Sequence, residues 1–257
     1  MRFIDTHAHL CDEKLPDTEQ VIKNFTINGV EKVINMACCI DTAKRARVMS
    51  DEYEELYFAS GIHPMDLKDA KDGDLELVEK IADHPKCVAI GEIGLDYYWD
   101  KSYKEKQKQG LIYQLELAEK LKLPFSFHSR EATLDTLTIL KENKSKLKYG
   151  GVLHCYAGSV ETAREILKLG LKFGFGGTST FKNARSVLEV ASFLPREAIL
   201  VETDCPFLAP EPLRGTVNEP KNIPIIVKKL AEIRGEDYEE LAEAIYQNTL
   251  ELFTKLK

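Results

Sequence analysis

The stretch FIDTHAHL, residues 3–10, begins as a short apolar strand and ends with two histidines one residue apart. In an extended chain, residues i and i+2 point to the same side, so the imidazoles of His7 and His9 face a common point. Neutral imidazoles are common metal ligands, and two of them on one side suit a single metal ion. This stretch therefore predicts a strand that carries metal-binding side chains at its carboxyl end.

Seven further apolar, β-branched segments follow, separated by amphipathic segments of helical period. The eight predicted strands are residues 2–5, 31–37, 56–60, 87–92, 123–128, 150–154, 171–176 and 198–202. The predicted helices are residues 17–25, 41–49, 75–82, 108–122, 131–143, 160–169, 184–194, 223–233 and 238–256. Near-continuous apolar strands that alternate with helices indicate parallel pairing with both faces covered. Eight repeats favour the α/β class as a (β/α)8 TIM barrel, with an open doubly wound sheet as the alternative.

The composition is that of a globular protein with a sizeable core. The 257 residues are 44% hydrophobic and 30% charged, and a barrel of this kind takes about 200–250 residues, which predicts one domain over residues 1–257. No stretch approaches the roughly 18 apolar residues of a membrane span, and no signal peptide is evident. We therefore expect a cytoplasmic protein with no membrane association and no obligatory protein partner. The net charge of −7 argues against a broad basic surface for nucleic acid, but bound metal ions can supply positive charge locally.

Polar side chains gather at the carboxyl ends of six predicted strands, where barrels of this kind carry their active sites. Besides His7 and His9, they are His63, Glu92, Asp96, His128, Arg130, His154, Glu202 and Asp204. The one remaining histidine, His84, precedes the fourth strand at the opposite end, where it is expected to be a helix-terminal or surface residue. Converging carboxylates and imidazoles are costly to bury unless a cation compensates them. The pattern therefore predicts a metal centre at the mouth of the barrel.

Together these motifs resemble the TatD family of metal-dependent deoxyribonucleases, within the amidohydrolase-like (β/α)8 barrels. The resemblance spans nearly the whole chain. Its markers are DTHAHL (5–10), GIHP (61–64), GEIGLDYY (91–98), Gln107, Gln114, LPFSFHSREA (123–132), GVLHCYAGS (151–159), TFKNA (180–184), ETDCPFLAPEPLRG (202–215), NEP (218–220) and NTLELF (248–253). Departures include Met65, where members often carry a histidine, and HSREA, where HTRDA is usual. They concern substrate contacts rather than the expected metal ligands.

The resemblance implies a centre of two divalent ions. It implies that His7, His9, Glu92 and Asp204 hold one ion, and that His128 and His154 hold the second with Glu92 as the shared ligand. It also implies cleavage of DNA phosphodiesters, commonly as a 3′→5′ exonuclease on single strands. Mg²⁺ or Mn²⁺ is expected to support activity, although so many imidazoles suit Zn²⁺ as the bound ion.

Roles in catalysis and substrate binding follow as hypotheses. Asp204 and Glu92 are the predicted catalytic residues, Asp204 accepting the proton of the attacking water and Glu92 bridging the two ions. His63 and Arg130 are predicted to bind substrate through charge-assisted hydrogen bonds to phosphate oxygens. These four side chains are therefore predicted to carry out catalysis and substrate binding at the metal centre.

The sequence leaves alternatives for the roles of two segments and for the function of the protein. Tyr97, Tyr98 and Trp99 form either a stacking surface for bases or apolar cover for the barrel rim. The proline-rich stretch 205–224 is a long loop over the mouth, which either faces substrate or connects to the final helices. The alternative functions are hydrolysis of a small amide, lactone or phosphoester, and a non-catalytic metal-binding scaffold.

Overall fold

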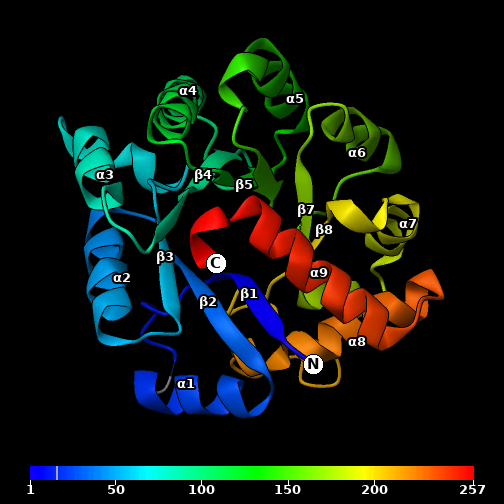
Figure 1. Cartoon of the computed structure of the whole chain (residues 1–257). Helices are drawn as coiled ribbons and strands as arrows, with labels where there is room; N and C mark the ends of the chain where they lie inside the picture. The colour runs from blue at the N-terminus through cyan, green and yellow to red at the C-terminus, as the bar shows by residue number, and fades with distance from the viewer. Residues whose placement is uncertain (16) are drawn as a thin grey trace.

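A computed structural model describes residues 1–15 and 17–257. It contains one sheet of eight parallel strands in the order β1 to β8 (Figure 1). The strands are β1 (Phe3–Ala8), β2 (Val30–Met36), β3 (Leu56–Ser60), β4 (Cys87–Asp96), β5 (Phe125–Arg130), β6 (Gly151–Leu153), β7 (Lys172–Phe175) and β8 (Ile199–Val201). Ala8 and Cys205 form a parallel bridge that joins the first strand to the segment after the last. The TIM barrel is confirmed, and the open sheet is wrong.

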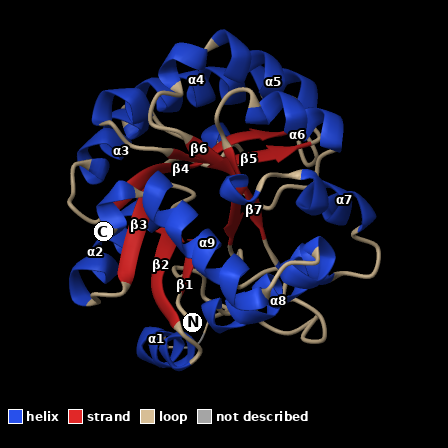
Figure 2. Ribbon diagram, turned by 45° about the vertical axis from the view of Figure 1, so that its right-hand side comes forward, coloured by secondary structure: helices blue, strands red, loops and turns tan. Residues whose placement is uncertain are grey.

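Helices connect consecutive strands and surround the sheet (Figure 2). They are α1 (Thr18–Ile27), α2 (Ile40–Glu52), α3 (Asp74–Ala82), α4 (Lys104–Leu121), α5 (Thr133–Glu142), α6 (Val160–Leu167), α7 (Arg185–Phe193), α8 (Ile223–Arg234) and α9 (Tyr238–Leu252). Short 3-10 segments are η1 (Asp66–Lys68), η2 (Lys144–Lys146), η3 (Gly177–Thr180), η4 (Arg196–Ala198), η5 (Pro220–Asn222) and η6 (Thr254–Leu256). Among the described residues, no helix combines the length and apolar character needed to cross a membrane.

Local chemistry sets where the last two helices begin and end. Helix α8 has a proline in its first turn and ends at Gly235, whose φ of 63° is the left-handed conformation that glycine adopts without strain. The carboxylate of Asp237 then accepts the backbone N–H groups of Glu239 and Glu240 and starts α9. This short connection turns the chain back across the barrel.

The amino-terminal end of the barrel is closed by the end of the chain. Figure 1 shows α9 and the carboxyl terminus crossing the end at which the strands begin. There the apolar side chains of Leu252, Phe253 and Leu256 join a buried cluster with residues of the strands, including Ile4 and Val88. This end is filled by apolar packing, whereas the polar groups lie at the opposite end, where the strands finish.

Two strands are longer than the sequence predicts. Strand β1 continues to Ala8 instead of ending at residue 5, and β4 continues to Asp96 instead of residue 92. Both extensions contain buried polar residues, Thr6 and His7 in β1 and Asp96 in β4. The apolar pattern stops where these polar side chains begin, although the backbone stays extended because strand pairing continues to Ala8 in β1 and to Asp96 in β4.

Candidate metal centre

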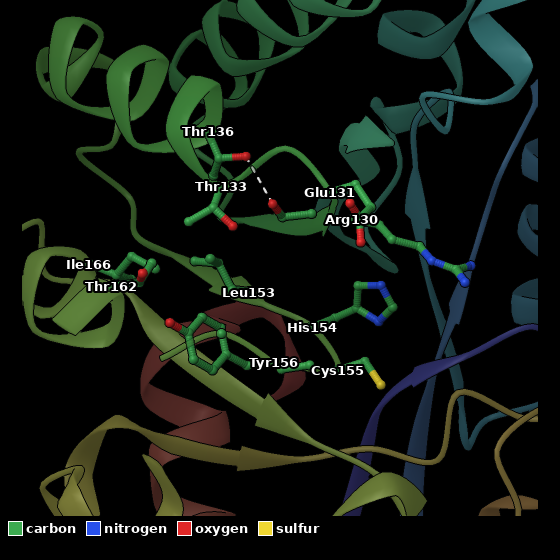
Figure 3. A pocket seen from close by; sticks show the side chains of 13 residues that line it. Arg130, Glu131, Thr133, Thr136, Leu153, His154, Cys155, Tyr156, Thr162 and Ile166 are labelled. Atoms are coloured by element: carbon green, nitrogen blue, oxygen red, sulfur yellow. Dashed lines mark hydrogen bonds between the residues drawn. The ribbon is translucent and has the colours of Figure 1, made fainter. Parts of the chain in front are cut away.

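The carboxyl ends of the strands bring the predicted ligands together around Glu92 of β4. Its Oε2 lies 3.4 Å from His7 Nε2 and 3.5 Å from His9 Nε2, both contributed by β1 and its continuation. Its Oε1 faces a different group, at 2.9 Å from His154 Nε2 and 3.1 Å from His128 Nδ1. The ring of His154, after β6, turns to the same side as the guanidinium of Arg130 (Figure 3). Each oxygen of one carboxylate thus faces its own set of imidazoles.

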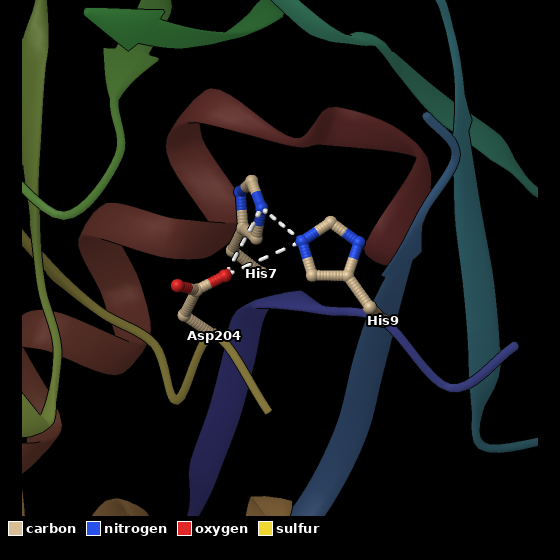
Figure 4. A group of neighbouring side chains, drawn as sticks. All are labelled: His7, His9 and Asp204. Atoms are coloured by element: carbon tan, nitrogen blue, oxygen red, sulfur yellow. Dashed lines mark hydrogen bonds and ion pairs between the residues drawn. The ribbon is translucent and has the colours of Figure 1, made fainter. Parts of the chain in front are cut away.

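Asp204 completes the group on the His7 and His9 side. Its Oδ1 lies 3.3 Å from His9 Nε2 and 3.8 Å from His7 Nε2 (Figure 4). The backbone holds this arrangement, because Asp204 N–H donates to His7 O at 2.8 Å and His9 N–H donates to Cys205 O at 2.8 Å. The contact that joins the first and last strands therefore also positions three side chains of the site.

Each of four imidazoles has an outer polar group facing the nitrogen that points away from Glu92. These pairs are His7 Nδ1 with Ser126 Oγ (3.1 Å), His9 Nδ1 with Cys38 Sγ (3.5 Å), His128 Nε2 with Asp96 Oδ2 (2.9 Å) and His154 Nδ1 with Glu202 Oε1 (3.5 Å). All four outer groups can accept a hydrogen bond from the ring N–H. A ring that donates outward presents a lone pair inward, which is the tautomer that binds a metal ion.

His63 presents the opposite chemistry. Its Nδ1 accepts the backbone N–H of Met65 at 3.2 Å, so the neutral ring carries its proton on Nε2. That Nε2 lies 3.5 Å from Glu92 Oε1, and burial lowers the pKa of His63 to about 3. His63 is therefore a neutral hydrogen-bond donor at the edge of the group, although it lies close enough to Glu92 and His128 to count among candidate metal ligands.

The charge balance of the group fits bound cations. Within residues 1–15 and 17–257, no lysine or arginine forms an ion pair with Glu92, Asp96 or Asp204, whose ionic contacts are all with histidines. Burial opposes the charge of Glu92, but positive charge on the neighbouring imidazoles, that of His154 above all, holds the pKa of this carboxyl well below its usual range. Where the imidazoles are neutral and turn lone pairs inward, a divalent ion would supply that positive charge instead. Ionised carboxylates and inward lone pairs without a permanent countercharge are what a divalent metal ion compensates. The residues present therefore fit divalent ions.

Two buried atoms of the described chain support the same fit. His154 Nδ1 and Glu202 Oε2 are buried without a hydrogen-bond partner, although His154 Nδ1 and Glu202 Oε1 are only 3.5 Å apart. Glu202 is fully buried, and its Oε1 accepts the backbone N–H of Cys155. A carboxylate behind a ligand histidine orients the ring and raises its basicity, and Glu202 would do this for His154 when His154 binds a metal ion.

Two glutamines of α4 hold the strand ends in place. The side-chain amide of Gln107 donates to Asp96 O and accepts from Asp96 N–H, both at 2.9 Å. Gln114 makes the same pair of contacts with the backbone of Ile62, next to His63. Both glutamines are fully buried. These residues, which the family resemblance marks, act through the backbone of the site rather than inside it.

The group lies in a cavity of about 840 Å³ at the mouth of the barrel. Apolar side chains on its wall include Trp99 and Phe207, and its cations include Lys14, Arg45 and Arg130. The guanidinium of Arg130 packs 3.7 Å from the ring centre of Tyr98, and Lys14 lies 4.6 Å from that of Phe207. Two cation–aromatic pairs thus stand beside the site.

The aromatic residues after β4 divide into two roles. Tyr97 is buried and its hydroxyl donates to Asp135 at 2.8 Å, so its ring belongs to the rim packing. Tyr98 and Trp99 are 51% and 66% exposed, so these two rings do not belong to that packing. From the sequence alone the three residues could not be told apart, because their neighbouring positions do not reveal which ring turns inward.

Sequence reasoning missed Ser126, Cys38 and Phe207. Ser126 precedes His128 by two residues on β5, and strand alternation is a signal that places both on one side. Cys38 lies two residues after the end of β2, where no histidine or carboxylate signals a site. Phe207 comes from the 205–224 loop, which therefore reaches the cavity rather than only connecting to α8.

A (β/α)8 barrel that gathers histidines and carboxylates in one open cavity at its carboxyl end defines the class of metal-dependent hydrolase barrels. The TatD related DNase family matches residues 4–254, and the chain belongs to this family. It is similar to the "uncharacterized metal-dependent hydrolase YabD" of Bacillus subtilis (strain 168), with 42% identity over 252 residues that cover 98% of both chains. The corresponding protein YcfH of Escherichia coli (strain K12) is 34% identical over 257 residues, covering 98% of this chain and 96% of its own.

Solved structures give the same result. The crystal structure of YjjV, a TatD homolog from Escherichia coli K12, matches with a TM-score of 0.94 at 34% identity and covers 98% of each chain. That of a TatD family hydrolase from Entamoeba histolytica matches with a TM-score of 0.87 at 27% identity, covering 99% of this chain and 98% of its own. The predicted family and fold are confirmed, and the chain is a metal-dependent hydrolase of the TatD family.

Proposed function

We propose that the protein is a deoxyribonuclease of TatD type with two divalent ions. His7, His9, Glu92 and Asp204 would hold one ion, and Glu92, His128 and His154 the other. The observation that supports this most directly is Glu92, whose two oxygens face separate sets of imidazoles. When bound, the ions supply Lewis-acid polarisation of a phosphate and a lowered pKa for water; we propose Mg²⁺ or Mn²⁺ for activity and Zn²⁺ as a resident alternative.

Asp204 is proposed to accept the proton of the attacking water. Its side chain is 13% exposed, whereas that of Glu92 is 3% exposed, so water in the cavity reaches Asp204 more readily. Its position beside His7 and His9 keeps the acceptor next to the proposed first ion. Glu92, enclosed on both sides by imidazoles, keeps a shared structural and electrostatic role.

His63 and Arg130 are proposed to bind the substrate phosphate. Because His63 Nδ1 accepts the N–H of Met65, the ring turns an Nε2–H inward to the site, which would donate to a phosphate oxygen without competing for the metal ions. Arg130 lines the same cavity and lies over Tyr98, which holds the guanidinium in one orientation. A neutral donor and a fixed cation thus complement the negative charge that the phosphate carries.

Single-stranded DNA is the proposed substrate. The cavity wall carries the cations Lys14, Arg45 and Arg130 beside the carboxylates Asp12 and Glu13, in a chain whose net charge is −7. Bound metal ions would supply the further positive charge that DNA requires. The exposed ring of Trp99, which lines the cavity, suits unpaired bases, which present a face for stacking. We further propose that residues 1–257 work as one domain in the cytoplasm without an obligatory protein partner.

The test is incubation of the purified protein with end-labelled single-stranded DNA, with EDTA or with added Mg²⁺ or Mn²⁺. The expected result is metal-dependent shortening of the strand, abolished by EDTA and by Asp204→Asn. The Asp204→Asn protein, prepared identically, excludes contaminating nucleases. Absence of shortening together with turnover of a panel of lactones, amides or small phosphoesters would replace the nuclease assignment with a small-molecule hydrolase.

A further inference from the structure

Cys38 is a thiol on the wall of the cavity that contains Glu92, and it faces the ring of His9. Its Sγ lies 3.5 Å from His9 Nδ1, the ring nitrogen that is turned away from Asp204 in Figure 4. One donor atom each of His9, Cys38 and Glu92 lies within 4.8 Å of the other two. Sulfur, nitrogen and oxygen donors therefore meet beside the proposed position of the first ion.

Backbone contacts hold Cys38 in this position. Its N–H donates to Thr42 Oγ1 at 2.9 Å, and its carbonyl oxygen accepts the N–H of His63 at 2.8 Å. The residue is half-buried, and its place on the cavity wall lets an ion from solution reach the sulfur. The thiol is thus both fixed by the fold and accessible from the cavity.

Two nearby cysteines do not share these properties. The Sγ of Cys39 lies 3.5 Å from Thr42 Oγ1, and Cys39 lines another cavity, of about 310 Å³. Cys11 lines the same cavity as Cys38, but it is buried, with its sulfur 3.7 Å from Thr42 O and 3.8 Å from Met49 Sδ. Of these three thiols, the one paired with an imidazole of the site is Cys38.

The spacing of this pair fits two ligands of one tetrahedral ion. With bonds of about 2.0 Å to nitrogen and about 2.3 Å to sulfur, tetrahedral angles place the two donors about 3.5 Å apart. A hydrogen bond to sulfur has a similar length, but sulfur is a weak acceptor. The other three imidazoles that have an outer partner face oxygen atoms instead. Orientation of the ring therefore does not account for sulfur at this one position.

We propose that Cys38 and His9 form an inhibitory site for thiophilic divalent ions such as Cd²⁺ and excess Zn²⁺. The inhibition, though not the binding of the ion, rests on the proposed function. Thiolate and imidazole suit such ions, whereas Mg²⁺ and Mn²⁺ prefer carboxylate oxygen and water. The thiol releases its proton to water as its sulfur binds the ion.

Inhibition follows from the two nitrogens of one ring. An ion on His9 Nδ1 leaves the proton of the neutral imidazole on Nε2. His9 then offers no lone pair on the side that faces Glu92 and Asp204, where the first ion is proposed to bind. Occupation of the site therefore removes a ligand of the catalytic ion without any contact to substrate.

Absorption of bound Co²⁺ tests the binding without an assay of activity. The full-length protein is freed of metal with a chelator and titrated with Co²⁺, in parallel with Cys38→Ser and the matched control Cys39→Ser. Serine keeps a hydrogen-bond acceptor for His9 but removes the thiolate. We expect the near-ultraviolet absorption of a thiolate–cobalt bond in the unmodified protein and in Cys39→Ser, and its loss in Cys38→Ser. Equal absorption in Cys38→Ser, or none in the unmodified protein, would overturn the proposal.

Inhibition by Cd²⁺ tests the consequence. Hydrolysis of bis(p-nitrophenyl) phosphate with Mn²⁺ is measured at increasing Cd²⁺, and each protein is compared with its own rate without Cd²⁺. In Cys38→Ser the Cd²⁺ concentration that halves the rate should rise about tenfold or more, because loss of a ligand weakens binding at least as much as loss of a group behind one. In Cys39→Ser it should stay within about twofold of the starting value.

Equal sensitivity to Cd²⁺ in Cys38→Ser and the unmodified protein would contradict the inhibitory role. If the unmodified protein hydrolyses neither DNA nor the small diester with Mn²⁺, the proposed function fails instead, and the Co²⁺ titration still decides whether Cys38 binds the ion.

Discussion

The two ends of the barrel are built from the same strands and have opposite chemistry. At the amino-terminal end, Phe253 and its neighbours fill the interior with apolar contacts to strand residues such as Ile4. At the carboxyl end, Glu92, His7 and Glu202 are buried among other polar groups, with no lysine or arginine of the described chain paired to either carboxylate. Burial of apolar side chains at the amino-terminal end stabilises the fold. Burial of polar side chains at the carboxyl end has an unfavourable free energy.

The residues that stabilise the fold and the residues that form the candidate metal centre therefore lie at opposite ends of the barrel axis. Apolar burial contributes about 25 cal/mol per Å² without requiring a ligand. Converging carboxylates and imidazoles contribute only when a cation compensates them. Substitutions at the closed end should therefore change unfolding and leave metal binding intact, and those at the mouth should do the reverse.

The strongest way to test the mouth is Glu92→Gln. The amide keeps the shape of the side chain but loses the charge and one of the two acceptor oxygens that face the imidazoles. We expect loss of roughly 10³-fold or more in kcat on DNA and fewer metal equivalents per chain. Metal analysis and nuclease kinetics measure these, with Glu116→Gln in an exposed ion pair as the control. Wild-type metal content in Glu92→Gln would show that Glu92 is not a shared ligand.

The closed end is tested by Phe253→Ala. This ring is fully buried in the cluster beneath the strands, so its removal leaves a cavity. We expect a loss of about 3–5 kcal/mol in the free energy of unfolding, with metal content and kcat per folded molecule unchanged. Chemical denaturation measures the effect, and Leu134→Ala, at a position that is 77% exposed, should change stability by less than about 0.5 kcal/mol. A parallel loss of metal would mean that the two ends are coupled.

A smaller effect at the mouth is expected for Asp96→Asn. Asp96 contacts His128 Nε2 at 2.9 Å and would orient the ring without touching the metal ion. Loss of its charge should weaken metal binding or activity by about 10- to 100-fold. Competition with a chelating indicator measures the affinity, and Asp100→Asn, whose carboxylate pairs with Lys68 at the surface, is the control. Equal effects from both substitutions would argue against a specific role for Asp96.

The smallest effect is expected for a substitution on the outer surface, which belongs neither to the apolar cluster nor to the metal centre. Lys141 and Lys168 lower the pKa of Glu165 to about 2, below its ordinary value of 4.5. A lowered pKa means that the stabilisation is present above pH 4.5 and is lost as the pH falls through about 2. Glu165→Gln should therefore lower Tm slightly at about pH 7, and the difference should vanish near pH 2. A difference that persists at the lower pH would have another origin.

Most of the fold could be predicted because its signals are local. Alternating apolar strands and amphipathic helices indicated the parallel barrel, and the position of each polar residue just after an apolar run placed it at the mouth. The same rule places His84 away from the mouth, because it precedes β4 instead of following a strand. Its ring pairs with Asp51 at 3.0 Å. The strand ends were the least accurate, because the backbone of β1 and β4 stays extended through polar residues that a local pattern assigns to loops.

The candidate site could be predicted as a set of residues but not as a set of contacts. Position along the chain brought His128, His154 and Asp204 to one rim, and their assignment as metal ligands stays a prediction. The outer partners could not be assigned in this way, because His7 and Ser126 are 119 residues apart and His9 and Cys38 are 29 apart. Such pairs depend on strand register and side-chain rotation, which apolar periodicity does not encode.

By itself, the sequence determined the order of strands and helices, the parallel pairing and the family, because periodicity and short motifs depend on neighbouring residues. Only the tertiary structure decided that Glu92 turns one oxygen to each set of imidazoles, that His63 faces inward as a donor, and that the Cys38 thiol lies beside the ring of His9. The physical reason is that lone pairs, tautomers and cavities are set by atoms that meet only when the barrel closes between Ala8 and Cys205.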